Sequence, residues 1–278
     1  MNFLALLAAL AAEQVLGGWR DDARPAVLTP LWQLIRPRHA VGVALLVAIP
    51  AALACLIDWE LDGHLLQPLF AGCVLFACLG PRDLDSVLQR LMQARADGDK
   101  ATAERLTRAL QSGPAPDANH RSLFGALFIQ SHERLFGVLL WFILFGPGGA
   151  VAYRIASRLP CELENDAPAL PAADTLHALL AYVPARITAM LFGLAGSLDQ
   201  ALASWRVVQA EPHPDWRRHT WSLLAESSAA ALDVDAPDGP AVAISLDSCL
   251  REVLRIQSRA LLLLLAADAL IATGTLFA

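Results

Sequence analysis

Long apolar stretches separated by polar, arginine-containing segments dominate the pattern of this chain. A helix that crosses a bilayer needs about 20 mostly apolar residues, with about 17 as the lower limit. The stretches that meet or nearly meet this length are 41–57, 65–80, 136–153 and 260–278. Residues 175–198 are also long enough, although they contain Pro184 and Arg186, and residues 3–16 form a shorter sixth stretch. The pattern predicts an all-α polytopic membrane bundle of five to six segments, some of them broken.

The polar regions between these segments also have helical periodicity. Residues 86–111 predict a pair of helices with one apolar face, interrupted at Gly98 and with Asp99 as the cap of the second helix. Residues 215–232 have the same period, and 241–259 begin a long helix that continues into the last apolar segment. We therefore expect a single membrane domain, 1–278, with helical cytoplasmic insertions at 81–135 and 199–259.

The distribution of basic residues predicts the orientation. If all six segments cross and the N-terminus is outside, the regions 17–40, 81–135 and 199–259 contain 18 of the 21 Lys and Arg residues. Region 58–64 then lies outside and has three acidic residues but no Lys or Arg. Since cytoplasmic loops of membrane proteins are rich in Lys and Arg, this asymmetry favours a multi-pass protein with large cytoplasmic loops. The first apolar stretch lacks a basic flank and contains Glu13, so we expect a retained helix, not a cleaved signal peptide. This helix either crosses the membrane or lies on its surface, and in the second case the N-terminus is inside.

Composition supports the membrane class and narrows the chemistry. Hydrophobic residues make up 56% of the chain and charged residues 17%, against about 25% charged in ordinary soluble domains. The net charge of −6 gives no reason to expect nucleic acid as a partner. The five cysteines and seven histidines show no metal-ligand spacing, so we predict no metal site. The phosphate-loop motif G-x-x-x-x-G-K-[ST] is absent, which leaves any cofactor unknown.

Ionisable residues inside apolar segments are costly and are therefore candidates for a functional site. Arg186 and Asp268 lie near the middle of their segments, so they could form a buried ion pair that serves either packing or an anionic or proton-linked site. Glu13 lies near the end of the first segment. It either reaches the interface or supplies a carboxylate to a cleft that faces the cytoplasm.

Residues 144–154, LFGPGGAVAYR, place a helix-breaking cluster inside an apolar segment. Pro147 and the glycines predict a break or kink, which a membrane accommodates only where internal groups or water satisfy the backbone. Tyr153 fits an aromatic belt at the outer end of a straight segment, and Arg154 would then mark the outer surface. If the chain instead folds back at the break, Arg154 faces inward.

The segment begins with SHERLFG, residues 131–137. Ser131 can cap the helix, and Glu133 and Arg134 fit charged anchors at the cytoplasmic interface. Trp141 is most simply explained as a lipid- or core-facing side chain.

The stretch 132–159, HERLFGVLLWFILFGPGGAVAYRIASRL, resembles the most distinctive part of the AmpE family. The apolar N-terminal segment with Glu13, ADGDKATAERL at 96–106 and YVPARITAMLFGLAGSLDQALASW at 182–205 occur in the order found in that family. The elements G-P-x-G-A-x-x-Y-R and P-A-R are also similar, more distantly, to the CobD/CbiB membrane proteins of cobalamin biosynthesis.

The AmpE resemblance implies an inner-membrane regulatory or sensory protein of Gram-negative bacteria, linked to cell-wall recycling and β-lactamase induction. It implies contact with the lipid bilayer, and further partners would be a cytoplasmic cell-wall amidase, an anionic small-molecule ligand, or a second copy of the chain. The CobD likeness implies instead a membrane synthase that joins an amino-alcohol phosphate to a corrinoid carboxylate, with Tyr153, Arg154 and Arg186 at matching motif positions. A small permease for muropeptides or similar anions is a third hypothesis. The candidate ligand-binding residues are Glu13, Tyr153, Arg154, Arg186 and Asp268.

Overall fold

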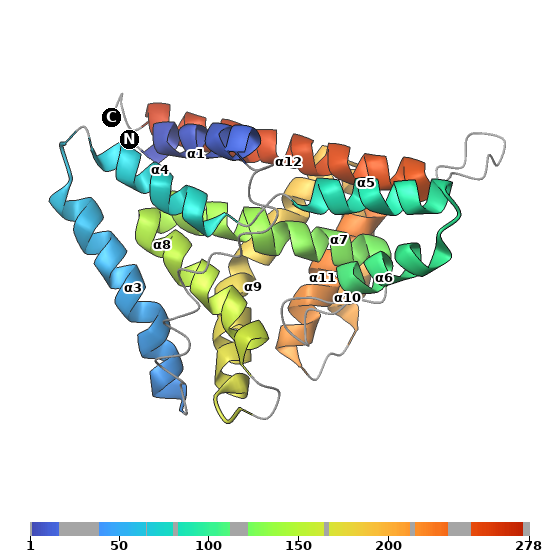
Figure 1. Cartoon of the computed structure of the whole chain (residues 1–278), viewed down its shortest axis with the longest axis horizontal. Coiled ribbons are helices and arrows are strands. Elements are labelled where there is room, and N and C mark those ends of the chain that lie inside the picture. The colour runs from blue at the N-terminus through green and yellow to red at the C-terminus, as the bar shows by residue number, and fades with distance from the viewer. Residues whose placement is uncertain are drawn as a thin grey trace. The chain divides into compact units, whose positions relative to one another are not determined.

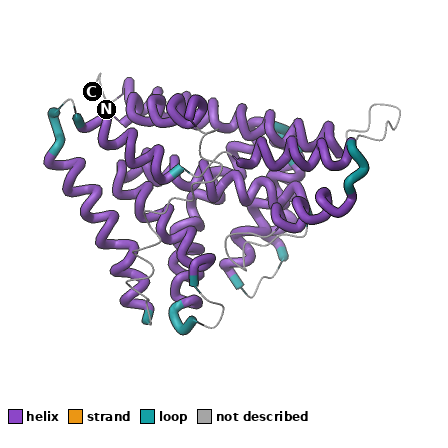
Figure 2. Tube along the Cα trace, in the orientation of Figure 1, coloured by secondary structure: helices purple, strands orange, loops and turns teal. Residues whose placement is uncertain are grey.

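The structure, a computed structural model, describes residues 2–16, 39–64, 66–79, 83–111, 122–163, 167–211, 215–232 and 246–274. Within these ranges the regular secondary structure is helical, with short loops between the helices (Figure 2). Four helical stretches are long and apolar enough to cross a membrane: Ala40–Glu60, Leu123–Glu162, Leu170–Ala195 and Leu246–Thr273. The predicted all-α membrane bundle is therefore confirmed.

The chain forms two compact units. The first unit comprises residues 1–82, 133–184 and 268–278, and the second comprises 83–132 and 185–267. Most of the two predicted insertions, 81–135 and 199–259, falls in the second unit. Their location in the cytoplasm stays a prediction.

The following helices, together with the end of the last helix, contribute to the first unit (Figure 1). They are α1 (Asn2–Leu16), α3 (Ala40–Glu60), α4 (Gln67–Cys78), α8 (Gly137–Glu162) and the first part of α9 (Leu170–Ala195). α1 packs on α4, and both α3 and α4 pack on α8. The 12 residues of α4 rise only about 18 Å, less than the roughly 30 Å core of a bilayer. α4 is thus shorter than the apolar segment 65–80 suggested.

Helix α3 runs antiparallel to the part of α8 that follows Gly146. Val43, near the start of α3, clusters with Leu159, near the end of α8. At the other end of the contact, Gly148 of α8 lies so close to α3 that an added Cβ would be 2.8 Å from the carbonyl oxygen of Ala51. A side chain at position 148 would therefore push the two helices apart.

The packing of α3 on α8 brings two distant parts of the chain together. The cluster around Val43 also contains Ala169, which lies between α8 and α9. The start of α3 and the α8–α9 connection are therefore at the same end of the first unit. A reversal of chain direction inside α8 contributes to this arrangement, and a hydropathy pattern does not register it. The predicted orientation of the chain in the membrane stays a prediction.

The reversal occurs at Gly146, where φ is 65° and ψ is −154°. An L-residue with a side chain rarely adopts a positive φ of this kind, so glycine is required here. Pro147 follows and cannot donate a backbone hydrogen bond to the preceding turn. The predicted break is confirmed. Of the two alternatives for Arg154, the structure shows the chain folding back.

The second unit contains the remaining helices and parts of α9 and α12. Its elements are α5 (Asp83–Ala96), α6 (Lys100–Gln111), α7 (Leu123–Ser131), α10 (Leu198–Ala210), α11 (Trp216–Ala230) and α12 (Leu246–Gly274). The predicted helix pair is α5 and α6, which pack together, and Asp99 caps α6 by accepting a hydrogen bond from the Thr102 backbone N–H at 3.1 Å. α11 and α12 confirm the other two predicted helices, while the predicted turn 236–240 lies outside the described residues.

Candidate functional site

A π-helical segment, His132–Phe136, connects α7 to α8 and contains the buried carboxylate of Glu133. The Tyr153 hydroxyl donates a hydrogen bond to Glu133 Oε1 at 2.9 Å. His177 Nε2 lies 2.9 Å from Glu133 Oε2, so one proton is shared between these two atoms. We call Glu133, Tyr153 and His177 the Glu133 cluster. Single π-helical turns are frequent at functional sites, because the extra residue redirects side chains.

The fold-back of α8 creates this cluster. Twenty residues separate Glu133 from Tyr153, a distance of about 30 Å along a straight helix. The break at Gly146 brings them into contact, and His177 reaches them from α9. A Cβ on Gly137 would overlap the Tyr153 ring, so the glycine leaves the space that this ring occupies.

The contacts with α3 give the depth of the cluster within the first unit. Tyr153 lies between Gly148, which faces Ala51, and Ile155, which packs with Val47. The cluster is therefore level with the middle of Ala40–Glu60, the most apolar candidate span. Two sequence-based interpretations are wrong: Glu133 is no interfacial anchor, being 4% exposed, and Tyr153 is completely buried instead of belonging to an outer belt.

Arg154 lies beside the cluster and is only 6% exposed. Its guanidinium interacts favourably with Glu133 and is repelled by Arg134 and Arg158. Within the part of the chain that the structure describes, the guanidinium makes no hydrogen bond or ion pair. Arg154 thus senses two further arginines and one carboxylate, and that carboxylate already has two hydrogen-bond partners. This excess of positive charge is suited to binding an anion.

Trp141 stabilises the helix that carries His177. Pro184 lacks the N–H that would bond to the Leu180 carbonyl in a regular helix. The indole Nε1–H of Trp141 donates to that carbonyl oxygen at 3.0 Å. The carbonyl freed by Pro184 is therefore satisfied by a side chain whose polar role the sequence did not indicate.

The other three candidate residues lie on α1, α9 and α12. Glu13 is in α1, and its side chain lies outside the described residues. Arg186 is half-buried in the part of α9 that belongs to the second unit. Asp268 is half-buried in the part of α12 that belongs to the first unit, so the Arg186–Asp268 pair stays a prediction.

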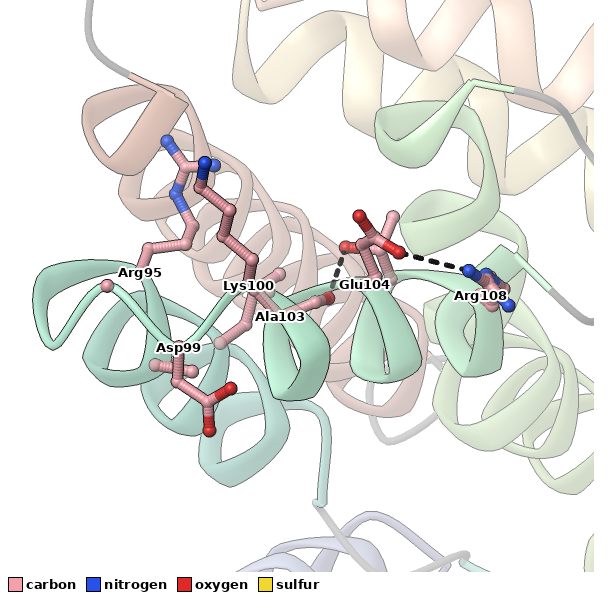
Figure 3. A pocket seen from close by; sticks show the side chains of 10 residues that line it. Arg95, Asp99, Lys100, Ala103, Glu104 and Arg108 are labelled. Atoms are coloured by element: carbon pink, nitrogen blue, oxygen red, sulfur yellow. Dashed lines mark hydrogen bonds and ion pairs between the residues drawn. The ribbon is translucent and has the colours of Figure 1, made fainter.

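A cavity of about 530 Å³ lies along the α5–α6 pair in the second unit. Figure 3 shows Arg95 and Lys100 extending to the same side of the pair, with Asp99 on the other. Glu104 accepts a hydrogen bond from Arg108 at 3.0 Å (Figure 3), and Arg95 pairs with Asp247 at 3.3 Å. Surface ion pairs of this kind occur widely, and the cavity walls hold no buried ionisable group. The Glu133 cluster with Arg154 is therefore the stronger candidate site.

Tyr153 and Arg154 were candidates from the sequence alone, whereas Glu133 and His177 were not. A signal for His177 was present, since it is a polar residue inside the apolar segment 175–198. No comparable signal marked Glu133, because its burial depends on the reversal of α8.

Two curated relatives are similar to this chain. Cobalamin biosynthesis protein CobD of Chromobacterium violaceum is 28% identical over 219 residues, which cover 76% of this chain and 67% of that protein. The protein of the same name from Stutzerimonas stutzeri is 28% identical over 169 residues, 58% of this chain and 54% of that protein. No protein-family model and no solved structure matches the chain. The likeness to CobD is thus supported, whereas the AmpE assignment receives no support from these relatives.

Proposed function

We propose that this chain is a multi-pass inner-membrane protein of CobD type, which binds a phosphorylated anionic substrate at Arg154. The observation that carries this proposal is a guanidinium that is 6% exposed and lacks an ion-pair partner among the described residues. The similarity to two proteins named for cobalamin biosynthesis supports the CobD type, and the phosphorylated substrate is what the CobD likeness of the sequence implies.

Burial makes Arg154 selective for an anion. Removing a charge from water is expensive unless a partner of opposite charge compensates it. A phosphate group offers several acceptor oxygens in the geometry that a guanidinium binds best. Arg158, half-buried one helical turn further on, adds positive charge to the same location.

The Glu133 cluster provides acid–base groups next to this anion site. The proton between Glu133 and His177 is held away from water, since both side chains are at most 4% exposed. A carboxylate–imidazole pair in this position can accept or release a proton when a charged ligand enters. Tyr153 donates a hydrogen bond to the other carboxylate oxygen, and the Arg154 guanidinium is attracted to the same carboxylate. An anion bound at Arg154 would therefore change the electrostatic potential at the shared proton.

The proposal also includes an orientation. We place the arginine-rich regions 81–135 and 199–259 in the cytoplasm, where a soluble partner such as a cell-wall amidase, or a second copy of this chain, would meet them. Regulation of β-lactamase induction and transport of muropeptides are the alternatives. Both use the same buried arginine to bind an anion without transforming it.

Complementation tests the proposal. The chain is expressed in a cobalamin-producing bacterium that lacks its own CobD, and growth that depends on cobalamin is measured. We expect the unchanged chain to restore growth and Arg154→Gln to abolish it. Arg206→Gln, which changes an exposed arginine of α10, is the matched control and should support growth.

Membrane levels of each variant are measured by immunoblotting, so that loss of growth can be separated from loss of protein. Failure of the unchanged chain to restore growth would reject the CobD-type function. An accompanying change in β-lactamase induction in the native host would then favour the regulatory alternative, and uptake of labelled muropeptide into vesicles would favour the permease.

A further inference from the structure

A separate polar site lies where α3 ends and α4 begins. Asp58 is in the last turn of α3, and Gln67 is the first residue of α4. The Gln67 side chain, 9% exposed, forms a hydrogen bond with Asp58. Because a carboxylate can only accept, the amide nitrogen must face Asp58, and the amide oxygen is left for another partner.

Two buried oxygen atoms at this site have no hydrogen-bond partner. They are Oδ1 of Asp58 and Oε1 of Gln67. The two side chains are hydrogen-bonded to each other through other atoms. A buried acceptor without a donor costs about 1–3 kcal/mol. Because the two side chains are hydrogen-bonded to each other, a single bound group could satisfy both acceptors.

The surroundings are negative. The negative charge of Asp62 makes the electrostatic potential at Asp58 more negative. The carbonyl groups at the C-terminus of α3 have the same effect. Residues 39–79 include no Lys or Arg that could neutralise these charges. The turn itself is defined, with a positive φ of 77° at Gly63 and a contact of 3.2 Å between His64 Nδ1 and the Asp62 carbonyl.

We propose that a hard cation of the Ca²⁺ class binds Asp58 Oδ1 and Gln67 Oε1 and joins the end of α3 to the start of α4. Carboxylate and amide oxygens are the ligands that Ca²⁺ takes, and water molecules fill its remaining positions. Asp62 contributes charge to the same site. This site is independent of the anion site at Arg154.

Terbium luminescence provides a direct test, because Tb³⁺ is a luminescent substitute for Ca²⁺ and is excited by a nearby tryptophan. Trp59 follows Asp58 in sequence and is 77% exposed. We expect the full-length protein in detergent to show saturable Tb³⁺ luminescence that Ca²⁺ displaces. Trp59→Phe should reduce this signal without changing Ca²⁺ binding measured by calorimetry.

Substitutions of the ligands identify the site. Asp58→Asn and Gln67→Leu should each raise the dissociation constant for Tb³⁺ about tenfold or more, since ligand number and charge set the affinity of oxygen sites. Gln67→Glu keeps an oxygen ligand and should retain binding. Glu60→Gln, which changes an exposed neighbour, is the control and should leave the constant unchanged.

Two results would overturn the proposal. One is the absence of a saturable signal while Trp59 is intact and the protein is folded by circular dichroism. The other is binding that Asp58→Asn and Gln67→Leu leave unchanged. In either case the two oxygens would share a proton on Asp58 instead of a cation.

Discussion

The carboxylate of Glu133 and the guanidinium of Arg154 are buried to the same degree in the first unit but have opposite surroundings. Both oxygens of Glu133 have a hydrogen-bonding partner, at 2.9 Å in each case. Arg154 has no such partner among the described residues and is repelled by two other arginines. A buried charge that is hydrogen-bonded within the protein contributes to the stability of the fold. A buried charge without such a partner is available to bind a ligand.

The comparison predicts opposite responses to truncation. Removing Glu133 leaves two buried groups without their partner, whereas removing Arg154 relieves an uncompensated charge. Substitutions at and near the Glu133 cluster should therefore lower the free energy of unfolding, and a substitution of Arg154 should affect ligand binding alone.

The largest loss is expected for Glu133→Ala. The substitution removes the acceptor of the Tyr153 hydroxyl and the partner of His177 Nε2, which should lower the free energy of unfolding by about 3 kcal/mol. Reversible unfolding in mixed micelles or bicelles measures this quantity. Glu133→Gln retains one acceptor oxygen and should lose clearly less. If Glu133→Ala were as stable as the unchanged protein, the cluster would not support the fold.

Gly137→Ala should also lower the free energy of unfolding, because it disturbs the Tyr153 ring of the same cluster. The new Cβ would overlap this ring, and overpacking of a buried position costs about 1–3 kcal/mol. A double-mutant cycle with Tyr153→Ala gives the control, because the methyl group should cost little once the ring is gone. Equal costs in both backgrounds would show that the tyrosine does not occupy this space.

Much of the fold, but not the reversal inside α8, could be predicted from the sequence. Apolar length predicted the long helices, and helical period with Gly98 and Asp99 predicted the α5–α6 pair. The break near Pro147 was also predictable, because a proline preceded by glycine disrupts a helix locally. The direction of the chain after the break was not predictable, since the backbone conformation at Gly146 depends on what the two halves of α8 pack against.

The site was less predictable for the same reason. Tyr153 and Arg154 stood out as polar residues after an apolar segment, but Glu133 looked like an interfacial anchor because it precedes that segment. Only the reversal at Gly146 brings Glu133 to the level of Val47 and Ala51 in α3. A pattern along the chain records neighbours in sequence and does not record a contact across 20 residues.

Trp141→Phe should have a smaller effect than the changes within the cluster. It leaves the Leu180 carbonyl, freed by Pro184, without its indole donor, and a hydrogen bond inside a membrane protein contributes about 0.6–1.7 kcal/mol. Unfolding measurements should therefore show a loss of about 1 kcal/mol. Trp59→Phe changes an exposed tryptophan and should have no effect. A neutral result for Trp141→Phe would mean that water satisfies the carbonyl.

Asp215 provides a water-exposed counterpart to Glu133. It caps α11, and its hydrogen bond with the Arg217 side chain is the main reason that its pKa lies below the usual value. A lowered pKa adds stability above the carboxyl's unfolded pKa, and this stability is lost as the pH falls through the folded value. We expect Asp215→Asn, which keeps a capping oxygen, to lose about 0.5 kcal/mol at neutral pH and to lack this pH dependence. A pH profile of unfolding that is identical in both proteins would contradict the pairing with Arg217.

The smallest change in stability is expected for Arg154→Leu. The leucine removes an uncompensated buried charge while keeping much of the apolar stem, so the free energy of unfolding should change by no more than about 0.5 kcal/mol. The same variant should fail in the complementation assay, because the anion loses its guanidinium partner. Arg206→Leu controls for the loss of an arginine at an exposed position. If Arg154→Leu lost as much stability as Glu133→Ala, Arg154 would be part of the folded framework, and the distinction between a satisfied carboxylate and a free guanidinium would no longer hold.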